Sequence, residues 1–373
     1  MRRPSASAVC WIPPWPGSST VISAVVVSYR SATLAVRAIA SLRADAARAE
    51  LSCEVVAVVN SGDPDEAATL GEAADRVVIP ASNLGYAGGL NAGVAAARGE
   101  VLFLANPDLV FLEGSAGALA EAVRGAGPVV AGPALFWDDA ASLILPPAEE
   151  PRPAELVRRV LALDPLRSPR LFRREVRRAL DREAFVRERR TAKVTALSGA
   201  LLATTRDTFE QVGPFDEGYR LYYEENDWQR RVRAAGGRLL FAGGARVVHR
   251  YAQSARREPR AEAWFHESER RYFEAHFGEA GRRALAWTAT AGAPPADPPT
   301  ESRLRWEGRQ EALVAVSPAA SFRPFALVRP ARGTGSFALP SEILSGHPDA
   351  AWYARAFDAS SFETLAEARL SPA

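Results

Sequence analysis

The feature of this sequence that most restricts its fold is a series of apolar runs separated by helix-like segments. The run from Val21 to Tyr29 is continuous and rich in valine, as in a strand buried on both faces of a parallel sheet. Further strand-like runs follow at 53–59, 76–79 and 101–105. The alternation predicts right-handed crossovers and an α/β fold with a Rossmann-like, mostly parallel central sheet.

Residues 83–108, NLGYAGGLNAGVAAARGEVLFLANPD, hold the first candidate binding site. We interpret the early glycines as a turn leading into a short helix that starts near Asn91. A Gly-rich loop at a helix N-terminus offers backbone N–H groups to an anion. Asp108 follows the strand 101–105, where open α/β sheets bind ligands. The two features suggest a nucleotide-diphosphate site; the alternative is a plain helix–strand connection with a turn.

A second stretch, residues 215–228, combines three carboxylates with aromatic side chains. Glu224, Glu225 and Asp227 stand at the start of a predicted helix, where the helix dipole favours negative charge for structural reasons alone. The neighbouring aromatic rings exclude water, which raises a carboxylate pKa toward the range of a useful base. His249 ends a β-rich run at the ligand-bearing edge, although a lone histidine is more often structural.

Composition excludes several other classes of protein. The formal net charge is only +2, so no global attraction to nucleic acid is expected. Two cysteines fit a reducing compartment better than a disulfide framework. No window approaches the roughly 20 apolar residues of a membrane span. Neither a G-x-G-x-x-G nor a G-K-[ST] loop follows the first strand, so dinucleotide and P-loop sites are excluded.

Composition also divides the chain. Residues 1–19 are Pro-rich and are predicted to be a disordered leader, followed by an α/β domain at 20–280. Arginines crowd a predicted helical insertion at about 147–193, which is either a solvated face or a surface for anionic lipid or an anionic acceptor. A linker is expected at 281–301, and short alternating segments at 302–373 predict a small all-β module.

Several short motifs occur in a consistent order between about residue 21 and residue 250. They are V-S-Y at 27–29, V-N-S-G-D at 59–63, N-L-G-Y-A-G-G-L-N at 83–91, L-A-N-P-D at 104–108, S-G-A at 198–200, G-P-F-D-E at 213–217, Y-Y-E-E-N-D-W at 222–228 and the histidine at 249. Each is weak alone. As an ordered set they resemble the family-2 inverting glycosyltransferases of the GT-A fold, particularly the rhamnosyltransferase-like branch.

The resemblance implies a single in-line displacement with inversion. Glu225 occupies the catalytic-base position, with Asp227 and Glu224 as competing candidates, while Asp108 and His249 would hold Mg²⁺ or Mn²⁺ on the donor diphosphate. Val59 stands where the family usually has an acidic residue, so nucleobase recognition would fall to nearby groups. The implied donor-binding residues are Tyr29, Asn60, Asp63, Asn83, Gly88, Gly89, Asn91, Asn106, Asp108, Ser198 and Gly199.

The expected enzyme transfers a sugar, with rhamnose as a candidate, from a nucleotide-diphosphate donor to a cell-surface glycan or lipid-linked acceptor. We expect a bacterial hexosyltransferase of cell-wall or polysaccharide biosynthesis. We expect it to be cytoplasmic. Peripheral contact with the anionic inner face of the membrane and assembly into a homo-oligomer are both left open. The alternatives are a sugar nucleotidyltransferase, which usually needs a Gly-rich basic loop at 29–31, and a catalytically degenerate glycan-binding protein.

Overall fold

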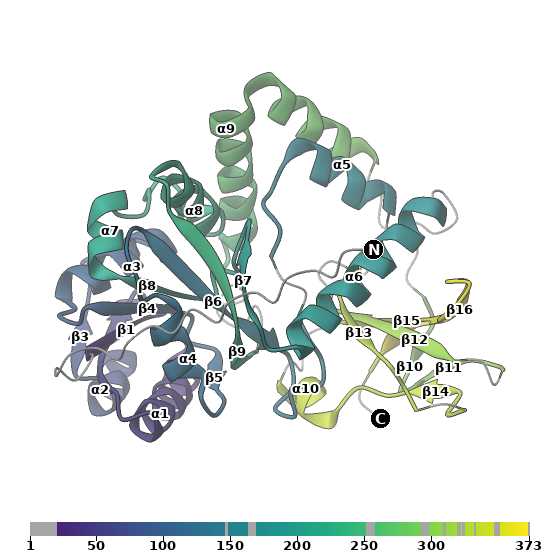
Figure 1. Cartoon of the computed structure of the whole chain (residues 1–373), viewed down its shortest axis with the longest axis horizontal. Coiled ribbons are helices and arrows are strands. Elements are labelled where there is room, and N and C mark those ends of the chain that lie inside the picture. The colour runs from purple at the N-terminus through teal and green to yellow at the C-terminus, as the bar shows by residue number, and fades with distance from the viewer. Residues whose placement is uncertain are drawn as a thin grey trace, which may run out of the picture.

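A large mixed sheet flanked by helices and a smaller C-terminal sheet make up the protein (Figure 1). The computed structural model describes residues 21–145, 148–162, 169–250, 258–291, 298–308, 311–318, 322, 325–331, 333–346 and 351–371. The predicted leader at 1–19 lies outside these residues. The α/β class and the small C-terminal β module are both confirmed.

Within the described residues the main sheet has nine strands, in the order β3-β2-β1-β4-β8-β6-β9-β5, with β7 also paired to β9. The strands are β1 (Val21–Ser28), β2 (Ser52–Val59), β3 (Arg76–Val78), β4 (Val101–Ala105), β5 (Leu109–Phe111), β6 (Val129–Phe136), β7 (Thr191–Val194), β8 (Leu201–Thr205) and β9 (Arg238–His249). The first four are mutually parallel, and β6 and β9 share their direction. The other three run the opposite way.

Helices cover both faces of this sheet. One face carries α1 (Ala32–Arg48), α2 (Pro64–Ala73) and α4 (Ser115–Ala122), and the other carries α3 (Gly85–Ala96), α7 (Arg206–Val212) and α8 (Glu224–Ala234). Side chains of β1 alternate between the two layers, because successive residues of a strand point to opposite faces. Ile22 and Val26 pack into the first layer, and Val25 and Val27 into the second.

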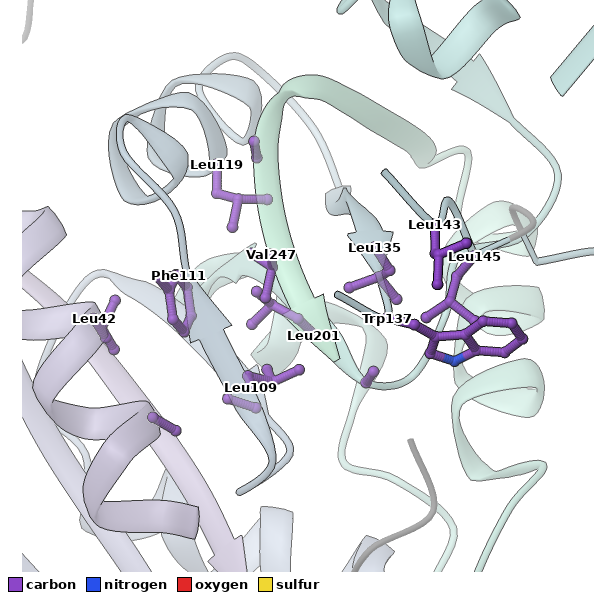
Figure 2. Packing of buried hydrophobic residues seen from close by; sticks show 14 of the residues in the cluster. Leu42, Leu109, Phe111, Leu119, Leu135, Trp137, Leu143, Leu145, Leu201 and Val247 are labelled. Atoms are coloured by element: carbon purple, nitrogen blue, oxygen red, sulfur yellow. The ribbon is translucent and has the colours of Figure 1, made fainter. Parts of the chain in front are cut away.

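The first layer forms a continuous apolar core (Figure 2). Leu109 and Phe111 of β5 and Val247 of β9 lie between α1 and α4 (Figure 2). The same cluster continues past β6 to Trp137, whose ring meets the ring of Trp352 edge-on at a centroid distance of 5.3 Å. The core of the α/β domain therefore reaches the C-terminal module.

The prediction of a Gly-rich turn before a helix near Asn91 is wrong, because α3 already begins at Gly85. The glycines within α3 let it pack closely on β1. A Cβ at Gly93 would lie 2.2 Å from Val25 Cγ1, and one at Gly89 would lie 2.8 Å from Val27 Cγ1. The glycine run therefore serves helix–sheet packing rather than a phosphate-binding loop.

The inserted segment contains two helices, α5 (Pro153–Ala162) and α6 (Pro169–Arg187), and α5 packs beside α9 (Ala261–Ala291), which is kinked at Gly278 (Figure 1). Because α9 continues to Ala291, the linker expected at 281–301 is wrong for its first eleven residues. Glu149 forms ion pairs with Arg158, Arg178 and Arg182. Part of the arginine cluster thus joins the insertion together.

The C-terminal module holds a five-stranded sheet, a two-stranded sheet and a short helix within the described residues. Its elements are β10 (Thr300–Glu301), β11 (Leu304–Arg305), β12 (Ala312–Ser317), β13 (Ala326–Val328), β14 (Ser336–Phe337), α10 (Ser341–Gly346), β15 (Trp352–Asp358) and β16 (Thr364–Leu370). Helix α6 lies against this module, with Phe172 and Phe357 at a centroid distance of 5.9 Å (Figure 1). Among the described helices, none combines the length and apolarity of a membrane span.

Candidate active site

A pocket of about 210 Å³ opens at the carboxyl edge of the parallel strands. Most of the predicted site residues line it: Tyr29, Asn60, Asn83, Asn106, Asp108, Ser198, Gly199, Glu224, Glu225 and His249. They come from segments far apart in the chain, because the ends of β1, β2 and β4 meet at one edge of the sheet. The remaining predicted residues, Asp63, Gly88, Gly89, Asn91 and Asp227, are not among its lining.

One end of the pocket is suited to a divalent cation. Antiparallel pairing of β5 with β9 sets Leu109 opposite His249, which brings Asp108 Oδ1 to 3.4 Å from His249 Nε2. Asn106 Nδ2 lies 3.4 Å from the same nitrogen. The described residues contain no group of three or more metal-ligating side chains. A carboxylate and an imidazole fit a cation that takes its other ligands from phosphate and water, as Mg²⁺ commonly does.

Two carboxyls stand next to each other at the start of α8: Glu224 is buried, and Glu225 is half-buried with its Oε2 atom inaccessible. The preceding residues, Tyr222 and Tyr223, have left-handed φ values of 65° and 67°, so the chain turns sharply into the helix. Burial raises the pKa of Glu225, and burial together with the Glu225 charge raises the pKa of Glu224 well above its usual range. A carboxyl with a raised pKa is a stronger base once it is ionised.

Neighbouring groups hold Glu225 in place. Gln229, one turn further along α8, accepts a hydrogen bond from Leu197 N at 2.7 Å and donates one to Leu197 O at 2.9 Å. These bonds fix the loop that contains Gly199. A Cβ at Gly199 would lie 2.9 Å from Glu225 Cγ, so only glycine leaves room for this side chain. Asn226 Nδ2 also donates to Glu225 Oε1 at 2.8 Å.

Asp227 is placed differently from the other two acidic residues. Its carboxylate accepts from Arg231 Nε at 2.9 Å, and its Oδ1 lies 3.0 Å from His276 Nε2. Both partners are structural groups of α8 and α9 outside the pocket lining. This arrangement ties the two helices together and leaves Asp227 poorly placed to act as a base.

The other end of the pocket is rich in amides. Both hydrogens of Asn60 Nδ2 are used, on Asn83 Oδ1 at 3.0 Å and Gly85 O at 2.8 Å, and its Oδ1 accepts from Leu84 N. Asn60 therefore shapes the loop before α3. A carboxylate also lies at this end, that of Glu258, which accepts from Asn83 Nδ2 at 3.3 Å and is hydrogen-bonded to Tyr29.

Other predicted donor-binding residues have structural partners. Asp63 caps α2 by accepting from Asp65 N at 2.9 Å. Asn91 bonds both the backbone N and O of Phe215 at 3.0 Å, which joins α3 to the loop before α8. A Cβ at Gly88 would lie 2.8 Å from Leu84 Cβ, so this glycine serves packing within α3.

Several further residues line the pocket and were not predicted as site residues from the sequence: Tyr86, Arg220, Leu221, Tyr222, Glu258 and Trp264. Tyr86 lies inside the recognised stretch 83–91, so its hydroxyl was the signal available in the sequence. Glu258 and Trp264 belong to no motif, and only the tertiary fold brings them to the pocket. Arg220 and Arg260 flank the Trp264 ring, at 5.7 and 4.6 Å from its centroid.

Residues 23–187 match the model of glycosyl transferase family 2. The predicted resemblance is confirmed. A segment of 93 residues is 37% identical to the N-acetylglucosaminyl-diphospho-decaprenol L-rhamnosyltransferase of Mycobacterium tuberculosis, in strains CDC 1551 / Oshkosh and ATCC 25618 / H37Rv. That segment is 25% of this chain and 30% of each relative. The match thus spans less than a third of the curated relatives' length.

Solved glycosyltransferase structures are also similar in outline. The match to GalNAc-T7 with UDP, GalNAc and Mn²⁺ covers 94% of this chain and 72% of the GalNAc-T7 chain, at 14% identity and a TM-score of 0.46. The mannosyltransferase PcManGT from Pyrobaculum calidifontis, in complex with GDP-Man and Mn²⁺, matches 75% and 80% at 15% identity and a TM-score of 0.41. TarS 1-349 of S. aureus matches 72% and 71% at 12% identity and a TM-score of 0.39.

Proposed function

We propose that this protein is an inverting glycosyltransferase that uses a nucleotide-diphosphate sugar. One observation carries the proposal: a metal-capable pair, Asp108 and His249, and a half-buried carboxyl of raised pKa, Glu225, line the same pocket. A transfer from a diphosphate needs both, since the leaving group gains negative charge while the attacking hydroxyl loses a proton.

In the proposed reaction the Glu225 carboxylate accepts the proton of an acceptor hydroxyl. The freed oxygen attacks the anomeric carbon as the bond from that carbon to the diphosphate oxygen breaks. A single displacement inverts the configuration at that carbon. Asp108 and His249 would hold a divalent cation, which when bound neutralises the departing diphosphate. Asp227, which is held by Arg231 and His276, is a weaker candidate for the base.

The amide-rich end of the pocket suits the nucleoside. Glu258 is hydrogen-bonded there to both Tyr29 and Asn83, and a carboxylate accepts well from ribose hydroxyls or from a base N–H. Glu258 would thereby supply the acidic group that the family usually has at the position of Val59. Ser198 and Asn106 would border the sugar diphosphate.

The acceptor is proposed from the named relative and from the surface. A rhamnosyltransferase acting on a diphospho-decaprenol compound makes rhamnose and a lipid-linked acceptor the leading candidates. Helix α6 adds a row of exposed arginines, at 170, 173, 174 and 177, whose spacing sets them along one side of the helix. Such a row is attracted to anionic headgroups, which would keep a cytoplasmic enzyme at the inner face of the membrane.

The test is a thermal-shift panel of UDP, dTDP, GDP, their sugar conjugates and the corresponding nucleoside triphosphates, with and without Mn²⁺. We expect at least one nucleoside diphosphate to stabilise the protein, more strongly with the metal, and Asp108→Asn to remove the metal-dependent part. Asp63→Asn is the matched control, because asparagine caps a helix as well as aspartate. Stabilisation by none of these ligands would favour the glycan-binding alternative, and a response to nucleoside triphosphates would favour the nucleotidyltransferase.

A further inference from the structure

Three buried side-chain oxygens at the pocket have no hydrogen-bond partner among the described residues. They belong to Tyr86, whose hydroxyl is buried, and to Glu224 and Glu225, each through Oε2. All three residues line the pocket. Buried polar groups almost always have partners, and exceptions in a native fold need an explanation. The role of proposed base explains the unpartnered oxygen of Glu225. The unpartnered oxygens of Tyr86 and Glu224 still need an explanation.

Tyr86 lines the same pocket as the metal-capable pair and the proposed base. Its backbone N donates to Arg220 O at 2.7 Å, which anchors the first turn of α3. Burial and the nearby charges of Glu224, Asp108 and Glu225 raise the pKa of the Tyr86 hydroxyl. The Tyr86 hydroxyl therefore lies within electrostatic reach of Asp108 at one side of the site and of Glu224 and Glu225 at the other.

Glu224 faces the same region from α8. Only about 3% of this residue is exposed, and no described side chain forms an ion pair with it. Glu225 alone suffices as a base for one displacement, and Asp227 is taken up by its ion pairs. The Glu224 carboxyl is therefore available for binding, and its unpartnered Oε2 would form a hydrogen bond with a ligand.

The ligand group that belongs between the diphosphate and the acceptor hydroxyl is the transferred sugar. Its hydroxyls both donate and accept, so they complement a phenol, which donates, and a carboxyl, which accepts when ionised. We infer that the Tyr86 hydroxyl and the Glu224 carboxyl bind hydroxyl groups of the transferred sugar and thereby select the donor. This inference rests on the proposed function. A site built to hydrogen-bond a substrate hydroxyl strongly rejects an analogue that lacks it.

The test compares nucleotide sugars with the same nucleotides lacking the sugar. Dissociation constants are measured by calorimetry with Mn²⁺ for UDP, dTDP and GDP, and for UDP-glucose, UDP-N-acetylglucosamine, dTDP-rhamnose and GDP-mannose. We expect Tyr86→Phe and Glu224→Gln each to weaken the preferred nucleotide sugar about tenfold, the size of one lost hydrogen bond. Each should leave its nucleoside diphosphate within about twofold of wild type, because that ligand lacks the sugar.

The control is Tyr223→Phe, since the Tyr223 hydroxyl donates to Glu269 Oε1 at 2.8 Å, away from the pocket. It should leave the affinities of both kinds of ligand unchanged. Equal weakening of nucleotide and nucleotide sugar by Tyr86→Phe and Glu224→Gln, or no weakening by either variant, would overturn the inference. If the wild-type protein binds none of the nucleotides or nucleotide sugars, the proposed function itself fails.

Discussion

At the scale of single residues, the position of Glu225 depends on a neighbour without a side chain. Gly199 faces the Glu225 methylenes so closely that a Cβ there would lie 2.9 Å from Cγ. The loop cannot retreat easily, because Gln229 holds Leu197 through both its backbone N and O. Asp227, two positions further along the helix, has different surroundings from Glu225. Its carboxylate interacts with Arg231 and His276.

Gly199→Ala is therefore expected to displace the Glu225 carboxyl and to lower kcat. A misplacement of about 1 Å in a reacting group can cost roughly a hundredfold in rate. The measurement is steady-state transfer with the best nucleotide sugar of the panel. Gly71→Ala is the matched control: a Cβ at this helical position meets nothing within 4 Å, so the rate should not change. A normal rate for Gly199→Ala would mean that Glu225 is not held as described.

Glu225→Gln should lower kcat by about 10²- to 10⁴-fold, the usual contribution of a general base, while donor affinity stays near that of wild type. The wild-type rate should also fall as the pH falls, because protonation removes the base. Burial raises the Glu225 pKa above its ordinary 4.5, so this loss should begin at a pH above that value. Rate profiles across pH test both points. Full turnover by Glu225→Gln would assign the base elsewhere.

At the scale of elements, the close packing of helix α3 on β1 sets the position of one wall of the pocket. Gly89 and Gly93 face β1 with no room for a Cβ, so the helix axis lies nearer the strands than an alanine-containing face would permit. This close approach lets the start of α3 contribute Tyr86 and Gly85 to the pocket. Gly88 and Gly89 were predicted to border the donor; neither lines the pocket, and Gly89 lets α3 lie close to β1.

Gly93→Ala should consequently destabilise the fold by about 1–3 kcal/mol, as overpacking of a well-packed core does. The added Cβ would stand 2.2 Å from Val25 Cγ1, and both elements must shift to admit it. Urea unfolding monitored by circular dichroism measures the free energy. Gly71→Ala, with open space at its Cβ, should instead gain up to about 1 kcal/mol through helix propensity. Equal behaviour of the two variants would contradict the packing role of Gly93.

At the scale of the whole molecule, the C-terminal module is joined to the α/β domain by apolar contacts. Trp137, just after β6, meets Trp352 of β15, and both belong to one buried cluster. Phe172 and Val176 of α6 belong to a second cluster, together with Phe357 of the small sheet. The inserted helix thus has the small sheet as its packing partner.

We expect the protein to unfold in a single calorimetric transition, because neither part can separate without exposing these rings. Trp352→Ala should cost about 3–5 kcal/mol and lower the temperature of that one transition. Trp287→Ala is a suitable control, since 37% of this α9 residue is exposed. Two well-separated transitions in the wild-type protein would show that the module folds independently. So would a Trp352→Ala variant in which only one of two transitions moves to a lower temperature.

Local patterns predicted much of the fold because they depend on neighbours in sequence. The run Val21–Tyr29 became β1, and the alternating C-terminal segments became a small sheet. The glycines at 85–93 misled the prediction, since glycine signals either a turn or a close contact and only the partner distinguishes the two. Glu258 and Trp264 carried no local signal at all.

The sequence by itself determined the α/β class, the resemblance to glycosyl transferase family 2 and the carboxyl edge as the place of the candidate site, because strand periodicity and ordered motifs are local properties. Tertiary structure decided which side chains meet there. It joined Asp108 to His249 through the β5–β9 register, gave Glu225 and Asp227 of α8 different surroundings, and brought Glu258 to the end of β1. Such contacts depend on distances through space, which a chain read in one dimension does not contain.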